Sequence, residues 1–248
     1  MRSYLFLFTV LISGNSICQR YITGNAFRSI ADHIHDETRL ISDVTKIKHA
    51  DIVFLKTDYL EDFFVNIFPK IEHPFILITH NSDYDAPGQF KDYLDSPKII
   101  KMFSQNPTIA HPKLVPIPIG VANNHFNHGK EQHFDYVRYK LKEYRKKYLV
   151  GIGFKPAKYT LYFGSERSDA YSIFSNKDYS QRVFSDNHIL YLSKMAECNY
   201  IVSPRGNGLD THRAWEALLV GSIPIVMSSP LDKAFDGLPV LVVNNWND

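Results

Sequence analysis

Apolar runs of strand length alternate along the chain with segments that have the mixed polar and apolar spacing of helices. The clearest succession is IVSPRGNGLDTHRAWEALLVGSIPIVMS, at residues 201–228. An apolar run there leads into a loop with two glycines, a segment of helix-forming composition and a second apolar run. Asp210 is a favourable N-cap residue, and Gly221 lies where a C-terminal cap belongs. This order predicts two parallel strands joined by a helix, with the loop at the carboxyl end of the sheet.

The same alternation predicts a first lobe over residues 1–130. The prolines of KLVPIPIGV are typical of an edge or twisted strand. We expect strands at residues 6–14, 50–58, 73–80 and 113–121, and helices at residues 23–35, 60–71 and 96–106.

Residues 131–148 predict a basic helix that connects the lobes and packs on the body through Tyr136, Leu141, Tyr144 and Tyr148. The second lobe covers residues 149–248 and includes the strand, loop, helix and strand of residues 201–228. Before these we expect strands at residues 148–154 and 159–165 and helices within residues 165–177 and 185–199. The predicted fold class is therefore α/β, with two Rossmann-like lobes facing across a crevice.

Residues 1–19 allow two interpretations. Their apolar run follows a single arginine and has the length of a signal-peptide core, but it is too short to span a membrane. We favour a first buried strand, because an α/β domain needs one, and with it a cytoplasmic protein. A signal peptide would instead place the protein in the lumen of the secretory pathway.

Composition narrows the class of partner. The chain has 248 residues, 44% of them hydrophobic, and a net charge of +2, which argues against a nucleic acid held by bulk charge. Cys18 and Cys198 are too few for a disulfide framework. His125 and His128 lie in a turn without a neighbouring Glu or Cys, so we expect no metal site there.

The loop and helix at residues 205–216 predict an anion site. Backbone N–H groups of residues 207–211, the helix dipole and the Arg205 guanidinium would attract a diphosphate. Gly206 and Gly208 are expected in a tight turn with positive φ. Glu216 could accept hydrogen bonds from ribose or sugar hydroxyls. The candidate binding residues are Gly206, Asn207, Gly208, Asp210, Thr211, His212, Arg213 and, from another strand end, Arg167.

Each of these assignments has a structural alternative. The loop could be a glycine turn with a surface ion pair between Arg213 and Glu216, and Arg167 could lie on the surface. In the first lobe, polar residues 80–85 follow a strand, and Asp83 stands where a catalytic base would be expected. That segment could equally be an Asx-rich turn that caps the next helix.

SPRGNGLDTHRAWEALLVGSIPIV, together with the later LPVLVVNNW, resembles the C-terminal signature of exostosin-like glycosyltransferases of the GT-B fold. The segments ILITHNSD, FSQN and PIPIGVANNHFNHG are similar to the acceptor-side half of some of these enzymes. The likeness covers most of the chain from residue 76 and is patchy between residues 129 and 186. The GT-B fold usually ends with a helix that crosses back to the first lobe, and the sequence shows none after residue 246. We therefore expect either a compact variant of the fold or lobes that are held less firmly.

The resemblance implies inverting transfer of a hexose or pentose from a nucleoside-diphosphate sugar to a hydroxyl of a glycan, glycoprotein or other acceptor. In that interpretation Asp83 is the favoured base, with His80 or Asp85 as alternatives that the resemblance does not decide between. Arg205 stabilises the leaving diphosphate, and Glu216 fixes the hydroxyls of the sugar donor. We expect no metal ion and no cofactor beyond the donor itself. The alternative is a non-catalytic module that binds a nucleotide sugar or sugar phosphate.

Overall fold

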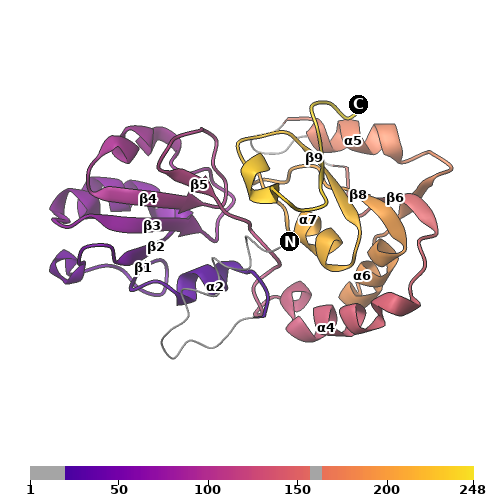
Figure 1. Ribbon diagram of the computed structural model, residues 1–248, viewed down its shortest axis with the longest axis horizontal. Coiled ribbons are helices and arrows are strands. Elements are labelled where there is room, and N and C mark those ends of the chain that lie inside the picture. The colour runs from indigo at the N-terminus through magenta and orange to yellow at the C-terminus, as the bar shows by residue number, and fades with distance from the viewer. Residues whose placement is uncertain (1–19, 157–163) are drawn as a thin grey trace. The chain divides into compact units, whose positions relative to one another are not determined.

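The computed structural model describes residues 20–156 and 164–248. The chain divides into two compact units, Met1–Ile117 and Pro118–Asp248. Each unit contains a five-stranded parallel sheet (Figure 1). The predicted α/β class is confirmed in this form, with one sheet in each half of the chain. Residues 118–130, expected in the first lobe, belong to the second unit.

The sheet of the first unit has its strands in chain order. Every neighbouring pair is parallel. The strands are β1 (His33–His35), β2 (Ile52–Lys56), β3 (Phe75–His80), β4 (Ile99–Ser104) and β5 (Leu114–Pro116). The proline-containing β5 lies at the edge of the sheet, as its sequence predicts.

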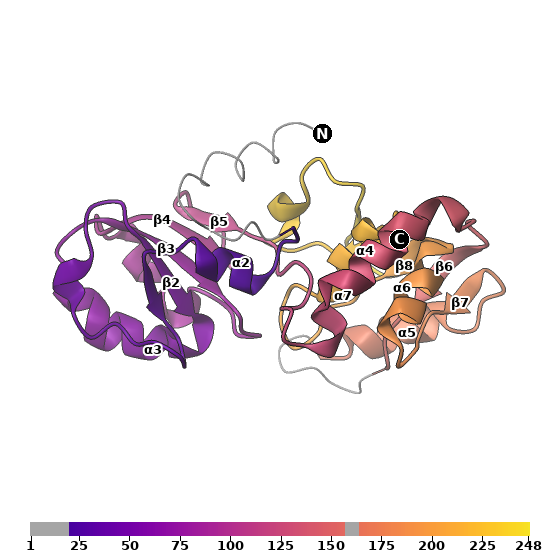
Figure 2. The same cartoon turned by 90° about the horizontal axis from the view of Figure 1, so that it is seen from below.

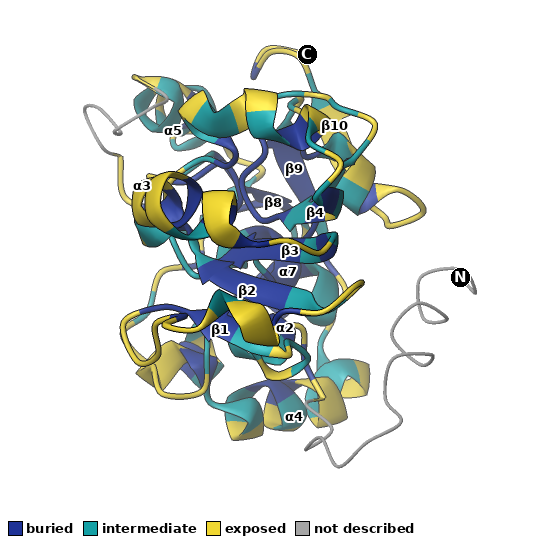
Figure 3. Cartoon of the chain, turned by 90° about the vertical axis from the view of Figure 1, so that its left-hand side faces the viewer, coloured by how far each residue is buried: buried dark blue, intermediate teal, exposed yellow. Residues whose placement is uncertain are grey.

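Alternation along β2 and β3 builds a core on both faces of this sheet. Val53 and Leu55 pack into a large cluster with Phe63, while Phe54 packs into a second cluster with Phe27. Figure 3 shows β2 and β3 as the buried centre of the unit. Its helices and helical turns are α2 (Gly24–Ser29), η1 (Val44–Lys46), η2 (Thr57–Tyr59), α3 (Leu60–Asp62), η3 (Phe63–Ile67), η4 (Phe68–Lys70) and η5 (Gly88–Asp95).

Two helix predictions in the first unit are wrong. The helix expected over residues 23–35 ends at Ser29, and its last three residues form β1. The helix expected over residues 96–106 is strand β4, in which Ile99 and Met102 are buried while Lys101 points to solvent and donates to the Pro112 carbonyl. Pairing with β3 and β5 determines this segment. The strand expected at residues 6–14 lies outside the described residues.

The sheet of the second unit has the order β10-β9-β8-β6-β7, and all its neighbours are parallel. The strands are β6 (Tyr148–Ile152), β7 (Ser180–Arg182), β8 (Cys198–Val202), β9 (Ile223–Met227) and β10 (Leu241–Val243). From β6 the chain first moves to β7 on one side and then returns to β8 on the other. The strand order therefore reverses between β6 and β8.

Right-handed crossovers place helices on both faces of this sheet. Helix α5 (Glu166–Phe174) covers one face, and α6 (His188–Ala196) and α7 (His212–Leu219) cover the other (Figure 2). The predicted strand, loop, helix and strand of residues 201–228 are confirmed, and Gly221 has a φ of 72° after α7. Short turns η6 (Asn127–Gly129), η7 (Leu141–Glu143) and η8 (Asp232–Phe235) complete the unit.

Helix α4 (Glu131–Lys140) is shorter than expected and packs against α6 within the second unit. Phe134 and Val137 are its buried residues, whereas Tyr136 is half exposed. The predicted packing stripe is therefore wrong for Tyr136, whereas Leu141, Tyr144 and Tyr148 are partly buried beyond the end of the helix. The strand expected at residues 159–165 falls mostly outside the described residues.

Candidate functional site

The reversal of strand order between β6 and β8 marks the candidate site. In open α/β sheets such a reversal leaves a crevice at the carboxyl ends of the two strands, because their following helices lie on opposite faces. Here β6 leads into Gly153 and Phe154, and β8 leads into the loop that precedes α7.

Two arginines from opposite faces meet beside one aromatic ring at this point. Arg167 lies in the first turn of α5, and Arg213 lies in the first turn of α7. Their guanidinium carbons lie 5.8 Å and 5.3 Å from the centroid of the Phe154 ring. The ring attracts both cations and limits their freedom of movement. Arg213 also donates through Nε to the Gly153 carbonyl at 3.3 Å.

Neither guanidinium is fully satisfied by the described residues. Arg167 Nε and Arg213 Nη1 are buried and have no hydrogen-bond partner among them. Burial, together with the charge of Arg213, lowers the pKa of Arg167. A buried cationic N–H group without an acceptor is costly. An anion between the two side chains would supply the missing acceptors, and a diphosphate suits paired guanidiniums well.

Glu216 lies on α7 within the same buried region, with 5% of its surface exposed. Its Oε1 lies 3.2 Å from His188 Nε2. The buried Tyr191 hydroxyl interacts electrostatically with both Glu216 and Arg213. Burial, with the nearby Glu216 charge, raises the pKa of Tyr191. The alternative of a surface ion pair is wrong, since Glu216 is buried and forms no ion pair with Arg213 within the described part of the chain.

Arg205 has a different environment from the one expected. Its Nη1 lies 3.3 Å from Glu166 Oε2, its backbone N–H donates to Glu166 Oε1 at 2.9 Å, and its Nη2 donates to the Ser228 carbonyl at 2.6 Å. Burial raises the pKa of Glu166, although the Arg205 hydrogen bond and charge oppose this. Arg205 therefore ties the loop to α5 and to the end of β9.

The glycine loop is less of an anion cradle than its sequence indicates. Neither Gly206 nor Gly208 has a positive φ, and the Gly206 N–H donates to the Gly208 carbonyl at 3.2 Å. Thr211 is the N-cap of α7, and its own N–H donates to Asp210 Oδ1 at 2.8 Å. The positive φ expected at Gly206 and Gly208 and the cap expected at Asp210 are both wrong, because the Gly206 N–H bonds within the loop and α7 begins after Thr211. Asn207, the remaining loop residue in the prediction, also makes a polar contact.

Asp210 is a buried structural carboxylate. It accepts from the Ile119 N–H at 2.7 Å and from Trp215 Nε1 at 2.8 Å. Burial raises its pKa to about 7, although these hydrogen bonds and that of Thr211 oppose the rise. Asp210 and His212, whose Nδ1 donates to the Gly120 carbonyl at 2.8 Å, together fasten residues 118–120 to α7.

Asp83 lies in the first unit, exposed in the turn after β3. Two side chains that follow β4 hold that turn. Gln105 Oε1 accepts from the Asn81 N–H at 3.0 Å, and Asn106 Nδ2 donates to the Ser82 carbonyl at 3.1 Å. Asn81 itself has a φ of 60°. The sequence predicted the turn but not that Gln105 and Asn106 hold it. These two amides directly follow β4, which was predicted as a helix.

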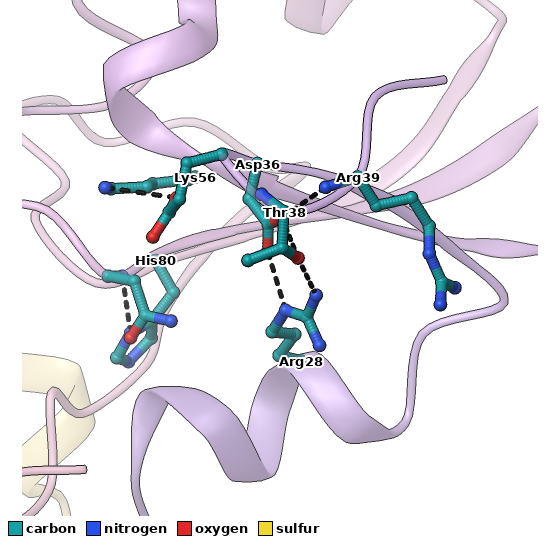
Figure 4. A network of polar contacts seen from close by, with 8 residues as sticks. Arg28, Asp36, Thr38, Arg39, Lys56 and His80 are labelled. Atoms are coloured by element: carbon teal, nitrogen blue, oxygen red, sulfur yellow. Dashed lines mark hydrogen bonds and ion pairs between the residues drawn. The ribbon is translucent and has the colours of Figure 1, made fainter. Parts of the chain in front are cut away.

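Figure 4 shows a second polar network at the carboxyl ends of β1 to β3. Arg28 donates through Nε to Asp36 Oδ2 at 2.6 Å and through Nη2 to Thr38 Oγ1 at 2.6 Å. Asp36 also accepts from the Arg39 N–H at 3.0 Å. Lys56 Nζ lies 3.2 Å from Glu37. These groups satisfy one another, so the network holds the strand ends together.

No family model and no curated protein sequence matches the chain. Among residues 20–156 and 164–248, no three His, Cys, Asp or Glu side chains gather as a metal ion would require. Over the same residues, no helix has the length and apolar character to cross a membrane. The side chains that define the candidate site all belong to the second unit. They are Arg167, Arg213, Phe154, Glu216 and Tyr191.

Proposed function

We propose that the chain is a metal-independent glycosyltransferase of the exostosin-like type, which transfers a hexose or pentose with inversion from a nucleoside-diphosphate sugar to an acceptor hydroxyl. The second unit binds the donor. The observation that carries the proposal is the pair of incompletely satisfied guanidiniums beside Phe154 at the reversal of strand order. The resemblance of residues 203–226 to exostosin-like enzymes supports the same assignment.

Each side chain then has a chemical task. As the bond to the anomeric carbon breaks, negative charge develops on the departing diphosphate, and Arg167 and Arg213 stabilise it. Glu216 accepts hydrogen bonds from hydroxyls of the nucleotide sugar, since a carboxylate has about four acceptor sites and His188 takes one of them. We assign the deprotonation of the attacking acceptor hydroxyl to Asp83. Arg205 orders the loop rather than contacting the diphosphate.

The test is calorimetric titration of the full chain with nucleoside diphosphates and their sugars. Arg167→Gln and Arg213→Gln should each weaken binding of the preferred diphosphate roughly tenfold or more, because each removes a charge-assisted hydrogen bond. Arg182→Gln is the matched control, an exposed arginine on β7 of the same sheet, and should bind as the wild type does. Wild-type affinity in both site variants, or no binding by the wild type, would defeat the proposal.

Transfer to acceptor, or slow hydrolysis of the bound donor, separates the enzyme from a binding module. Asp83→Asn should keep the donor affinity and lose most of the turnover, because the amide cannot take a proton. Full turnover in Asp83→Asn removes this residue as the base. Donor binding without any turnover in the wild type favours the binding module.

A further inference from the structure

A chain of three side chains leads from the surface of α4 to Glu216. His133 lies partly exposed on α4, His188 is buried at the start of α6, and Glu216 is buried on α7. His133 Nδ1 lies 3.3 Å from His188 Nδ1, and His188 Nε2 lies 3.2 Å from Glu216 Oε1. Both ring nitrogens of His188 therefore face a specific polar atom.

These contacts constrain where the protons can be. An ionised Glu216 can only accept, so His188 must donate to it through Nε2–H. A neutral His188 then has no proton on Nδ1 and accepts there. The facing nitrogen, Nδ1 of His133, must consequently carry a proton. Only one proton fits between the two Nδ1 atoms, because two N–H donors cannot bond each other.

We infer that His188 is a positioning residue for Glu216 and that His133 fixes the tautomer of His188. The inference rests on the proposed function, in which Glu216 holds the donor hydroxyls. Without this chain the Glu216 carboxylate would lose its hydrogen bond to His188. With it, one Glu216 oxygen is held by His188, and the remaining acceptor sites are available to a ligand.

The groups that surround the two rings fit this arrangement. The ring centroids of Phe134 from α4 and Tyr191 from α6 lie 5.3 Å and 6.0 Å from that of His188, and the His128 centroid lies 6.3 Å away. Burial lowers the pKa of His133, and the charge of Lys130 acts in the same direction. Burial likewise lowers the pKa of His128. A neutral His133 ring is thus favoured near neutral pH.

The first test determines which ring nitrogens carry protons, and it needs no ligand. In the full chain with nitrogen-15-labelled histidine, near neutral pH, ring nitrogen shifts should give His188 as Nε2–H and His133 as Nδ1–H. His133→Asn and His188→Asn assign the two rings. The opposite pattern, with the shared proton on His188 Nδ1 or with His133 as the Nε2–H tautomer, would overturn the inference.

The second test measures affinity for the nucleoside-diphosphate sugar that the wild type binds most tightly. His188→Leu should weaken binding about tenfold, the value of one hydrogen bond to a charged group. His188→Gln should retain most of the wild-type affinity, because the glutamine amide N–H can replace the histidine Nε2–H. His111→Leu is the matched control, since His111 Nε2 lies 3.2 Å from Asp95 in the first unit.

A double-mutant cycle distinguishes positioning from a general loss of packing. Combined with Glu216→Gln, His188→Leu should cause no further weakening. Additive effects, or wild-type affinity in His188→Leu, would overturn the inference. If the wild type binds no nucleoside diphosphate sugar at all, the proposed function fails, whereas the tautomer measurement still decides the His133–His188 arrangement.

Discussion

Arginine residues in this chain occur in two contrasting environments. Arg28 and Arg205 are each paired with a carboxylate, Asp36 and Glu166. Arg167 and Arg213 have no such partner among the described residues and retain buried N–H groups without an acceptor. Removing one partner of a buried pair leaves an uncompensated charge. The paired arginines therefore stabilise the fold, and the unpaired arginines are the ones suited to a ligand.

The Arg28–Asp36 pair gives a prediction about acid stability. Burial of Asp36 raises its pKa, but the hydrogen bonds from Arg28 and Thr38 outweigh burial, and the pKa falls from 3.8 to about 2. Because the folded-state pKa lies below the unfolded one, the stabilisation is present above about pH 4 and is lost as the pH falls toward 2. This difference is equivalent to about 2 kcal/mol.

Arg28→Met should accordingly lower the free energy of unfolding by about 2 kcal/mol near neutral pH and by much less near pH 2. Urea denaturation at several pH values measures this. Lys46→Met is the control, because Lys46 lies on the surface, 3.9 Å from Asp43, and exposed pairs contribute little. An equal loss at every pH in Arg28→Met would contradict the account.

Site residues close in sequence were predictable together, and those from other elements were not. Arg213 and Glu216 are three residues apart on one helix, so their shared region follows from helical spacing. Arg167 was predicted only as a cation at a strand end. His188, Tyr191 and Phe154 reach the site through the packing of α6 and the path of β6, which no local pattern encodes.

Elements were predicted well where their periodicity is unambiguous. The apolar runs of β2, β3, β8 and β9 each gave the correct strand, and α6 and α7 the correct helices. β4 was mistaken because Lys98 and Lys101 interrupt its apolar residues with a spacing that a helix also allows. Its pairing between β3 and β5 is a tertiary effect.

Two glycines in connecting segments should respond to substitution in opposite ways. A Cβ on Gly129, in η6, would lie 2.1 Å from the Asn123 carbonyl oxygen and 2.5 Å from that of Ala122. Backbone atoms cannot move aside cheaply, so Gly129→Ala should cost about 1–3 kcal/mol. A Cβ on Gly206 would meet only Thr211 Cγ2, at 3.8 Å. Gly206→Ala should therefore be neutral or slightly stabilising.

Thermal denaturation of both variants measures the contrast. A severe loss of stability in Gly206→Ala would mean that the loop needs a conformation that only glycine adopts. That result would support the positive φ expected from the sequence. A neutral Gly129→Ala would mean that residues 122–129 pack more loosely than their contacts indicate.

At the scale of the whole molecule, each half of the chain has its own parallel sheet and its own hydrophobic core. The sequence predicted this division, but it placed the boundary at residue 130 rather than at Ile117. Asp210 and His212 hold the Ile119 and Gly120 backbone on α7. These bonds join residues about ninety positions apart, which explains why no local pattern identified them.

Separate cores predict that damage to one unit stays largely within it. Phe63 is fully buried among the rings of Phe64, Phe68 and Phe75, so Phe63→Ala should cost about 3–5 kcal/mol. Native-state hydrogen exchange should then show reduced protection of β2 and β3 with little change in β6 and β8. Ile152→Ala in the second unit should give the reverse pattern. Equal loss of protection in both sheets from either variant would instead mean that the two cores unfold as one cooperative unit.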